Sequence, residues 1–336
     1  MIPAIFGLSG LTLTDDERAF FRDSDPAGYI LFGRNIENRE QLRRLTDELR
    51  SLDGRANLPI LIDQEGGRVA RMKSPEWPAF PSGAAFDALY ERAPASAIEA
   101  ARLNAMALAA MLSEVGITVD CLPLLDVRQP GSSDVIGDRA LGSEPMRVAA
   151  LGRAILGGLQ DGGVVGIVKH IPGHGRALLD SHKELPVVTA LDRDLQTDLA
   201  PFAALRDAAM AMTCHVVFTA WDADRPATLS PIIIDSVIRQ RIGFHGLLLS
   251  DDLDMEALSG DVPSRAADAV AAGCDIALNC WGKMDDMVGI ANALDPISTV
   301  SLARLEGAMD RIAGAGDHHR AFASLVDQRD ALLATA

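Results

Sequence analysis

The sequence predicts a single-domain (β/α)8 TIM barrel, an α/β fold. Eight short runs of apolar and β-branched residues alternate with longer amphipathic segments along the 336 residues. Such alternation is typical of a parallel sheet covered by helices, and eight units are the number that closes a barrel. A doubly wound sheet is the alternative, but no GxGxxG turn follows the first predicted strand.

The strands are predicted at residues 4–8, 29–32, 59–63, 118–122, 164–169, 211–215, 247–251 and 275–279. Helical periodicity predicts helices that include residues 39–52, 95–115, 146–161, 195–208, 230–242 and 264–272. Two further helices, 299–313 and 320–334, are expected to pack on the outside of the barrel. No linker, repeat or low-complexity tract divides the chain, so we expect one catalytic domain over residues 1–336.

The composition restricts the partners of this chain. The net charge is −16 and no Lys/Arg cluster is present, so nucleic acid is not an expected partner. No apolar run reaches the roughly 18 residues that a membrane span needs. The N-terminus, MIPAIFGLSG, lacks the basic region of a signal peptide, and the four cysteines form no CxxC pair. We therefore expect a cytoplasmic monomer with free, buried thiols that acts on a small ligand.

Polar residues follow seven of the eight predicted strands. Because the carboxyl ends of barrel strands meet on one face, these side chains should converge there as a polar pocket. The residues are Arg34, Asn35, Asp63, Gln64, Glu65, Asp126, Lys169, His170, His215, Asp251, Asp252 and Asn279.

Asp251 ends the apolar strand 247–251, in the run LLLSDDLDMEAL. A partly desolvated carboxylate at the barrel mouth can attack an anomeric carbon and form a glycosyl-enzyme. The alternative is a helix N-terminus with acids in its first turn, and this alternative is stronger for Asp252 and Asp254 than for Asp251.

Two other strand-end residues suit sugar binding. Asp63, in IDQEGGRVARM, can accept hydrogen bonds from vicinal hydroxyls; a tight turn in which Arg68 pairs with Glu65 is the alternative. Arg139, in VIGDRALGSE, can bind a substrate oxygen with its planar fork, and a surface salt bridge with a nearby acid is equally compatible with the composition.

The stretch KHIPGHGRALLDSHK, residues 169–183, is the richest in reactive side chains. Lys169 and His170 are neighbours at a strand end, so strand alternation predicts that their side chains diverge. His170 and His174 are four residues apart, but the intervening proline and glycine exclude the regular helix that would make this a zinc spacing. Asp180 and His182 are two apart, and a carboxylate beside an imidazole makes a general acid/base.

Several of these motifs, in this order and spacing, resemble those of the family 3 glycoside hydrolases, in the branch of bacterial β-N-acetylglucosaminidases of peptidoglycan recycling. The matching segments are YILFGRN, IDQEGGRV, IGDRALG, KHIPGHG, DSHKELP, SDDLDME and GCDIALNC. The resemblance covers most of the barrel. It implies a retaining exo-β-N-acetylglucosaminidase that removes terminal N-acetylglucosamine from muropeptides bearing anhydro-N-acetylmuramic acid.

The resemblance also implies residue roles. Asp251 corresponds to the nucleophile, and His182, supported by Asp180, corresponds to the acid/base. The residues that correspond to the N-acetylglucosamine-binding set are Asp63, Arg139, Lys169 and His170. No metal and no cofactor are implied.

Three alternatives stay open at this stage. A metal-dependent barrel hydrolase would use His170, His174, His215 and Asp251. A phosphorylase of the same fold would replace water with phosphate, which a neutral histidine acid/base would not repel. A non-enzymatic sugar-binding barrel is the third alternative, against which the complete set of Asp251, Asp180 and His182 argues.

Overall fold

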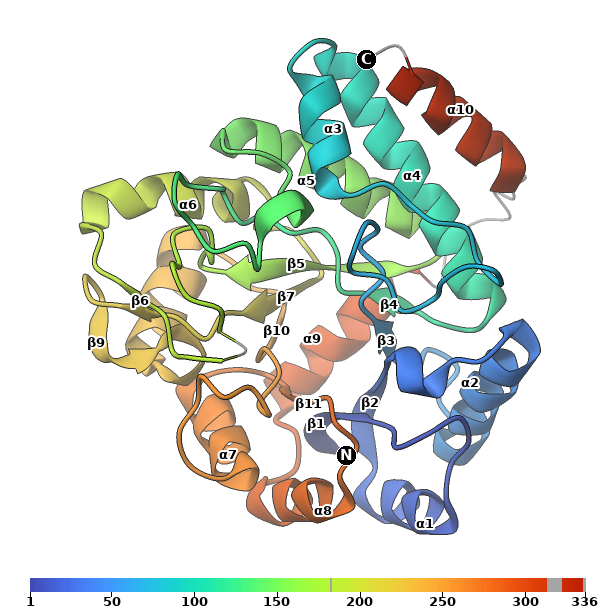
Figure 1. Cartoon of the computed structure of the whole chain (residues 1–336). Coiled ribbons are helices and arrows are strands. Elements are labelled where there is room, and N and C mark those ends of the chain that lie inside the picture. Colours follow the sequence, from blue (N-terminus) through green and yellow to red (C-terminus); the bar gives the residue numbers. More distant parts are fainter. Residues whose placement is uncertain (182, 313–321, 335–336) are drawn as a thin grey trace.

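The computed structural model describes residues 1–181, 183–312 and 322–334. Its main sheet is a ring of eight parallel strands (Figure 1). In chain order they are β1 (Ile2–Gly7), β2 (Pro26–Leu31), β3 (Ile60–Ile62), β4 (Val119–Asp120), β5 (Val165–Ile171), β7 (Met210–Thr213), β10 (Leu247–Leu249) and β11 (Ala277–Asn279). Each pairs with the next, β11 pairs back with β1, and a bridge from Leu249 to Ile276 closes the ring. The predicted (β/α)8 barrel and its eight strands are confirmed.

Helices surround this ring (Figure 1). They are α1 (Asp15–Ser24), α2 (Arg39–Asp53), α3 (Gly83–Tyr90), α4 (Pro94–Glu114), α5 (Pro145–Asp161), α6 (Asp192–Ala204), η4 (Ile233–Ile242), α7 (Val262–Ala272), α8 (Met284–Ala293), α9 (Thr299–Met309) and α10 (Phe322–Ala334). Every segment predicted as a helix overlaps one of them. Helices α1, α3 and α8 are additional to those singled out from the sequence.

The strands begin as apolar runs because both of their faces are buried, and polar residues appear only near their carboxyl ends. In β1, Ile5 belongs to the core inside the ring, together with Ile30 of β2 and Leu61 of β3. The flanking residues Ala4 and Phe6 belong instead to the core between ring and helices. This division explains why the strand signals are continuous apolar runs rather than alternating patterns.

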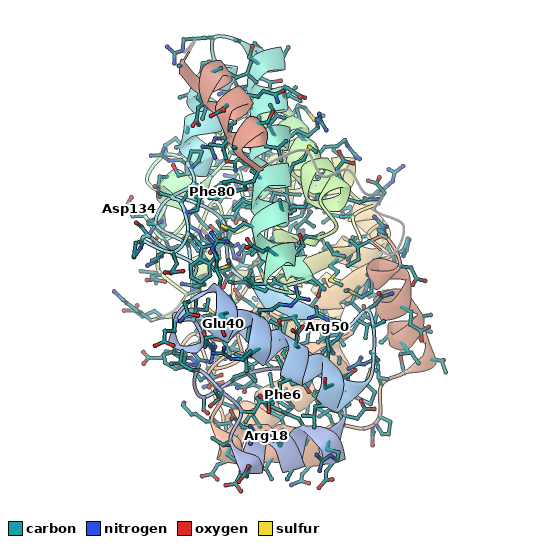
Figure 2. All side chains as sticks on the ribbon, turned by 90° about the vertical axis from the view of Figure 1, so that its right-hand side faces the viewer. Phe6, Arg18, Glu40, Arg50, Phe80 and Asp134 are labelled. Carbon is teal, nitrogen blue, oxygen red and sulfur yellow. The ribbon has the colours of Figure 1, made fainter. Side chains whose placement is uncertain are left out.

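The two C-terminal helices make different contacts. In α9, the residues Leu305, Ala308 and Met309 join the core inside the ring. Helix α10 lies along α4 (Figure 2), where the Phe322 ring packs edge-on against Phe80 with 6.4 Å between centroids.

Helix α4 is, among the described residues, the one helix with the length and hydropathy of a membrane span. Its most apolar window is 67% buried, and the helix packs against α3, α5 and α10. We therefore interpret its apolar character as core packing.

A small second sheet lies beside the loop that follows β5. It consists of β6 (Val187–Val188), β8 (Val217–Phe218) and β9 (Asp222–Pro226). The backbone N–H of Val217 donates to the Pro186 carbonyl at 2.9 Å. The sheet therefore holds the far end of the loop that contains Asp180.

Candidate active site

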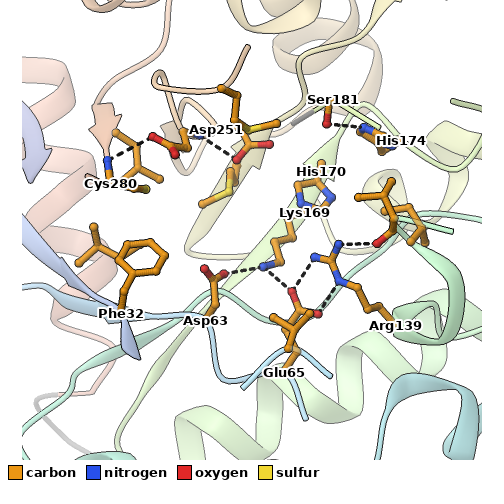
Figure 3. Close-up of a pocket in the computed structure, with 18 of the residues that line it drawn as sticks. Phe32, Asp63, Glu65, Arg139, Lys169, His170, His174, Ser181, Asp251 and Cys280 are labelled. Atoms are coloured by element: carbon orange, nitrogen blue, oxygen red, sulfur yellow. Dashed lines mark hydrogen bonds and ion pairs between the residues drawn. The ribbon is translucent and has the colours of Figure 1, made fainter. Parts of the chain in front are cut away.

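The carboxyl ends of the barrel strands surround an open cavity of about 770 Å³ (Figure 3). Seven residues predicted from strand ends and motifs line it, namely Asp63, Glu65, Arg139, Lys169, His170, Asp251 and Asp252. Its wall also includes Phe32, Met212, Met255 and Leu278, which give it an apolar side.

Lys169 connects the two carboxylates that follow β3. Its Nζ lies 2.9 Å from Asp63 Oδ1 and 2.7 Å from Glu65 Oε1. The lysine side chain is 2% exposed, so burial by itself would lower its pKa, but the two carboxylates outweigh burial and raise it. Lys169 is therefore a fixed cation with one ammonium hydrogen left for a ligand.

Arg139 pairs with Glu65 rather than with a surface acid. Its Nε and Nη2 donate to the two Glu65 oxygens at 2.8 and 2.7 Å, and its Nη1 donates to the Val135 carbonyl. Burial alone would raise the pKa of Glu65, but Lys169 and Arg139 lower it. The alternative in which Arg68 pairs with Glu65 is also wrong, because Arg68 binds Asp138 instead.

Two glycines shape the turn that presents these carboxylates. Gly66 and Gly67 have φ of 96° and 56°, a region that favours glycine. A Cβ on Gly66 would lie 2.3 Å from the Pro81 carbonyl oxygen, so a side chain there would displace the turn. Asp63 lies at the start of this turn, and its second oxygen accepts from Arg71 Nη2 at 3.2 Å.

Replacing Lys169 by Met should lower the free energy of unfolding by about 3 kcal/mol at pH 7, the lower end for breaking a buried ion pair, because Arg71 and Arg139 stay paired. The pKa values of Asp63 and Glu65 are lowered, so their stabilisation is present above the unfolded-state pKa and is lost as pH falls. The difference should therefore shrink between pH 5 and 2. Denaturant titrations of both proteins measure it, with Lys183→Met as the exposed control. An unchanged difference at low pH would contradict the ion-pair origin.

Lys169 and His170 both line the cavity, so the prediction that their side chains diverge is wrong. The register between β5 and β7 shifts between Lys169 and Ile171. Such an irregularity interrupts the alternation of side chains and re-aims one of them.

Asp126 is the buried group that orients His170. Its Oδ2 lies 2.7 Å from His170 Nδ1, and its Oδ1 accepts the backbone N–H groups of His170 and His174 at 3.2 and 2.7 Å. Burial alone would raise the pKa of Asp126. The interaction with His170 outweighs burial and lowers this pKa to about 2. With Nδ1 donating to this carboxylate, a neutral His170 leaves Nε2 as an acceptor for a ligand hydroxyl.

Asp251 lies on the cavity wall opposite the Asp63–Glu65–Arg139 side (Figure 3). It is half-buried, its Oδ1 accepts the Asp252 N–H at 2.8 Å, and its own N–H donates to Thr213 at 3.3 Å. No helix begins here: Asp252 binds the N–H groups of Asp254 and Cys280, so the helix-start alternative is wrong. Burial first, then Asp254, raise the pKa of Asp252 to about 7.

Both ring nitrogens of His215 have hydrogen-bond partners. Its Nδ1 is 2.8 Å from the Thr228 hydroxyl, and its Nε2 donates to the Asp252 carbonyl at 2.9 Å. The part of the chain that the structure describes contains no group of three or more His, Cys, Asp or Glu side chains able to hold a metal. His170, His174 and Asp251 of the metal-dependent alternative line the same cavity, but they do not form such a group.

The loop of residues 176–186 reaches the cavity through Ser181. Ser181 lines the cavity, and its hydroxyl lies 3.0 Å from His174 Nε2 (Figure 3). Asp180, one residue before, is half-buried, and its carbonyl accepts from Lys183 N at 2.9 Å. The predicted acid/base His182 lies outside the described residues.

Arg71 and Ser181 line the cavity but were not predicted as residues of the site. Arg71 follows β3 in the run DQEGGRVAR, so its position after a strand end was the available signal. For Ser181 no pattern pointed to the cavity, because a serine in a loop is common in any surface segment.

Comparison with known proteins decides the family. The model described as the Glycosyl hydrolase family 3 N terminal domain matches residues 7–315. This chain belongs to glycosyl hydrolase family 3. It is therefore a glycoside hydrolase, and the expected resemblance is confirmed.

Relatives of this family 3 enzyme extend over nearly its whole length. A β-hexosaminidase of Aromatoleum aromaticum is 38% identical over 315 residues, 92% of this chain and 87% of the relative. A β-hexosaminidase of Alkalilimnicola ehrlichii is 38% identical over 313 residues, 91% of this chain and 88% of the relative. The structure of NagZ from Neisseria gonorrhoeae in complex with N-trifluoroacetyl-D-glucosamine superposes with a TM-score of 0.87, at 32% identity over 98% of both chains.

Proposed function

We propose that this family 3 hydrolase is a retaining exo-β-N-acetylglucosaminidase. The observation that carries the proposal is the placement of Asp251 across one small cavity from a paired array of donors and acceptors (Figure 3). The β-hexosaminidase relatives and the glucosamine derivative bound to the gonococcal NagZ support the choice of sugar.

The sugar-binding residues are Asp63, Arg139, Lys169 and His170. Each is already oriented by another protein group: Lys169 and Arg139 by Glu65, His170 by Asp126, and Asp63 by Arg71. Each also keeps unused hydrogen-bonding capacity, since a carboxylate accepts about four bonds and a guanidinium donates five. Preorganised side chains bind hydroxyl and amide groups without losing further rotamer entropy.

The reaction has two displacements. The Asp251 carboxylate attacks the anomeric carbon as the bond to the leaving oxygen breaks, and His182 gives that oxygen its proton. A water molecule then attacks the glycosyl-enzyme, its proton passes to His182, and the bond to Asp251 breaks. Asp180 keeps the imidazole in the tautomer that these transfers need.

The natural substrate in this proposal is a muropeptide with an N-acetylglucosamine at its non-reducing end, linked to anhydro-N-acetylmuramic acid. The resemblance of the sequence motifs to those of the peptidoglycan-recycling branch supports this substrate class, and the glucosamine derivative bound to NagZ supports the terminal sugar. We also propose a cytoplasmic location. All four cysteines are free and buried, as is usual in a reducing compartment.

The first-formed product should have the β configuration. Each displacement inverts the anomeric carbon, so two restore it. Proton NMR of the hydrolysis of an aryl β-N-acetylglucosaminide, recorded before mutarotation, measures the anomer directly. The initial appearance of the α-anomer would exclude a glycosyl-enzyme on Asp251 and would overturn the proposed mechanism.

A further inference from the structure

His174 is buried beside the catalytic cavity and its backbone is anchored on both sides. It is 3% exposed. Its N–H donates to the carboxylate of Asp126 at 2.7 Å, and its carbonyl accepts from Ala177 N at 3.1 Å. These two backbone hydrogen bonds fix the position from which the His174 side chain extends. The same Asp126 carboxylate also orients His170.

The His174 side chain makes one hydrogen bond among the described residues. Its Nε2 lies 3.0 Å from the hydroxyl of Ser181, which is itself 3% exposed. Its Nδ1 is buried and has no partner in the described part of the chain. A buried polar atom without a partner costs about 1–3 kcal/mol. Stability of the core therefore does not explain an imidazole at this position.

Ser181 belongs to a stretch that has little apolar anchoring. Leu178 and Leu179, just before it, are 69% and 44% exposed. After it, the backbone N–H groups of Lys183 and Glu184 donate to the Asp180 carbonyl. These hydrogen bonds lie within the loop and do not attach it to the barrel. The His174–Ser181 hydrogen bond thus connects this stretch to the rigid end of β5.

Burial is the main cause that lowers the pKa of His174, to about 4. The imidazole is therefore neutral at the pH where a glycosidase of this kind would work. A neutral ring can bind the Ser181 hydroxyl without adding a positive charge near the proposed acid/base, which must itself be protonated to act as an acid.

We propose that His174 is a positioning residue, which acts through Ser181 to hold the neighbouring Asp180 and His182 in register with Asp251. The inference rests on the proposed acid/base role of His182. Proton transfer to a leaving oxygen requires the donor to be placed within a fraction of an ångström, and a misplacement of about 1 Å can cost roughly 100-fold in rate.

The test is the glycosylation rate of Ser181→Ala across aryl β-N-acetylglucosaminides whose leaving groups differ in pKa. We expect a loss of roughly 10- to 100-fold on poor leaving groups and a much smaller loss on good ones, with KM nearly unchanged. Ser181→Thr keeps the hydroxyl and should restore most of the rate. Lys183→Ala, with an exposed side chain on the same loop, is the control and should match the wild type.

The His174→Leu variant completes a double-mutant cycle. If the two residues act through one hydrogen bond, the double variant should be no slower than the slower single variant. If His174→Leu does not fold, the comparison of Ser181→Ala with Ser181→Thr decides alone. An equal loss on good and poor leaving groups, or no loss, would overturn the role of His174. If His182→Ala also lost the same rate on good and poor leaving groups, the acid/base assignment itself would be wrong. If His182→Ala lost more rate on poor leaving groups, only the positioning role of His174 would be wrong.

Discussion

Asp251→Asn should abolish turnover, with a fall in kcat of at least about 10⁴-fold, because removal of a nucleophile that no neighbour replaces has effects of this order. Asn is isosteric with Asp, and its side-chain oxygen can still accept the Asp252 N–H that Asp251 accepts at 2.8 Å. The variant should therefore fold. Steady-state hydrolysis of a chromogenic β-N-acetylglucosaminide measures the loss.

Nearby carboxylates are poor substitutes for Asp251. Asp63 and Glu65 are paired with Lys169, and Asp63 also binds Arg71. Asp252 is committed to the N–H groups of Asp254 and Cys280. A near-wild-type rate in Asp251→Asn would show that another group attacks the sugar.

Asp254→Asn is the matched control for this experiment. Asp254 lies in the same turn but binds Asn279 Nδ2 at 2.5 Å and does not line the cavity. It should keep most of the activity. A loss as large as that of Asp251→Asn would point to disruption of the turn instead of loss of a nucleophile.

His182→Ala should have the second-largest effect, a loss of roughly 10²–10⁴-fold on substrates with poor leaving groups, which is the usual contribution of general acid catalysis. A leaving group that departs without a proton does not need the acid, so its glycosylation rate should fall less. Asp180→Ala should act in the same direction but more weakly, because it orients the imidazole without transferring the proton.

Pre-steady-state glycosylation rates across leaving groups of rising pKa make the comparison. His245→Ala serves as the control, since His245 is exposed and lies just before β10, at the opposite end of the barrel. Equal losses in His182→Ala for good and poor leaving groups would mean that His182 is not the acid.

The positions of the site residues along the chain were predictable from the sequence because they follow strands. A buried parallel strand is a short, continuous apolar run, and the first charged residue after it marks the end that faces the cavity. Asp63 and Asp251 follow this rule, and both line the cavity. The pairing of Arg139 with Glu65 was not predictable, because the two residues are 74 positions apart and only the closed ring brings them together.

The sequence by itself therefore determined the eight-stranded barrel, its family and most of the charged residues that line its cavity. The tertiary structure decided which of these residues form hydrogen bonds and ion pairs with one another. It joined Lys169 and Arg139 through Glu65, turned His170 into the cavity at an irregular step in β5, and connected His174 to Ser181. The physical reason is that apolar periodicity is a local property of the chain, whereas the partner of a buried charge depends on which strand ends the closed barrel places side by side.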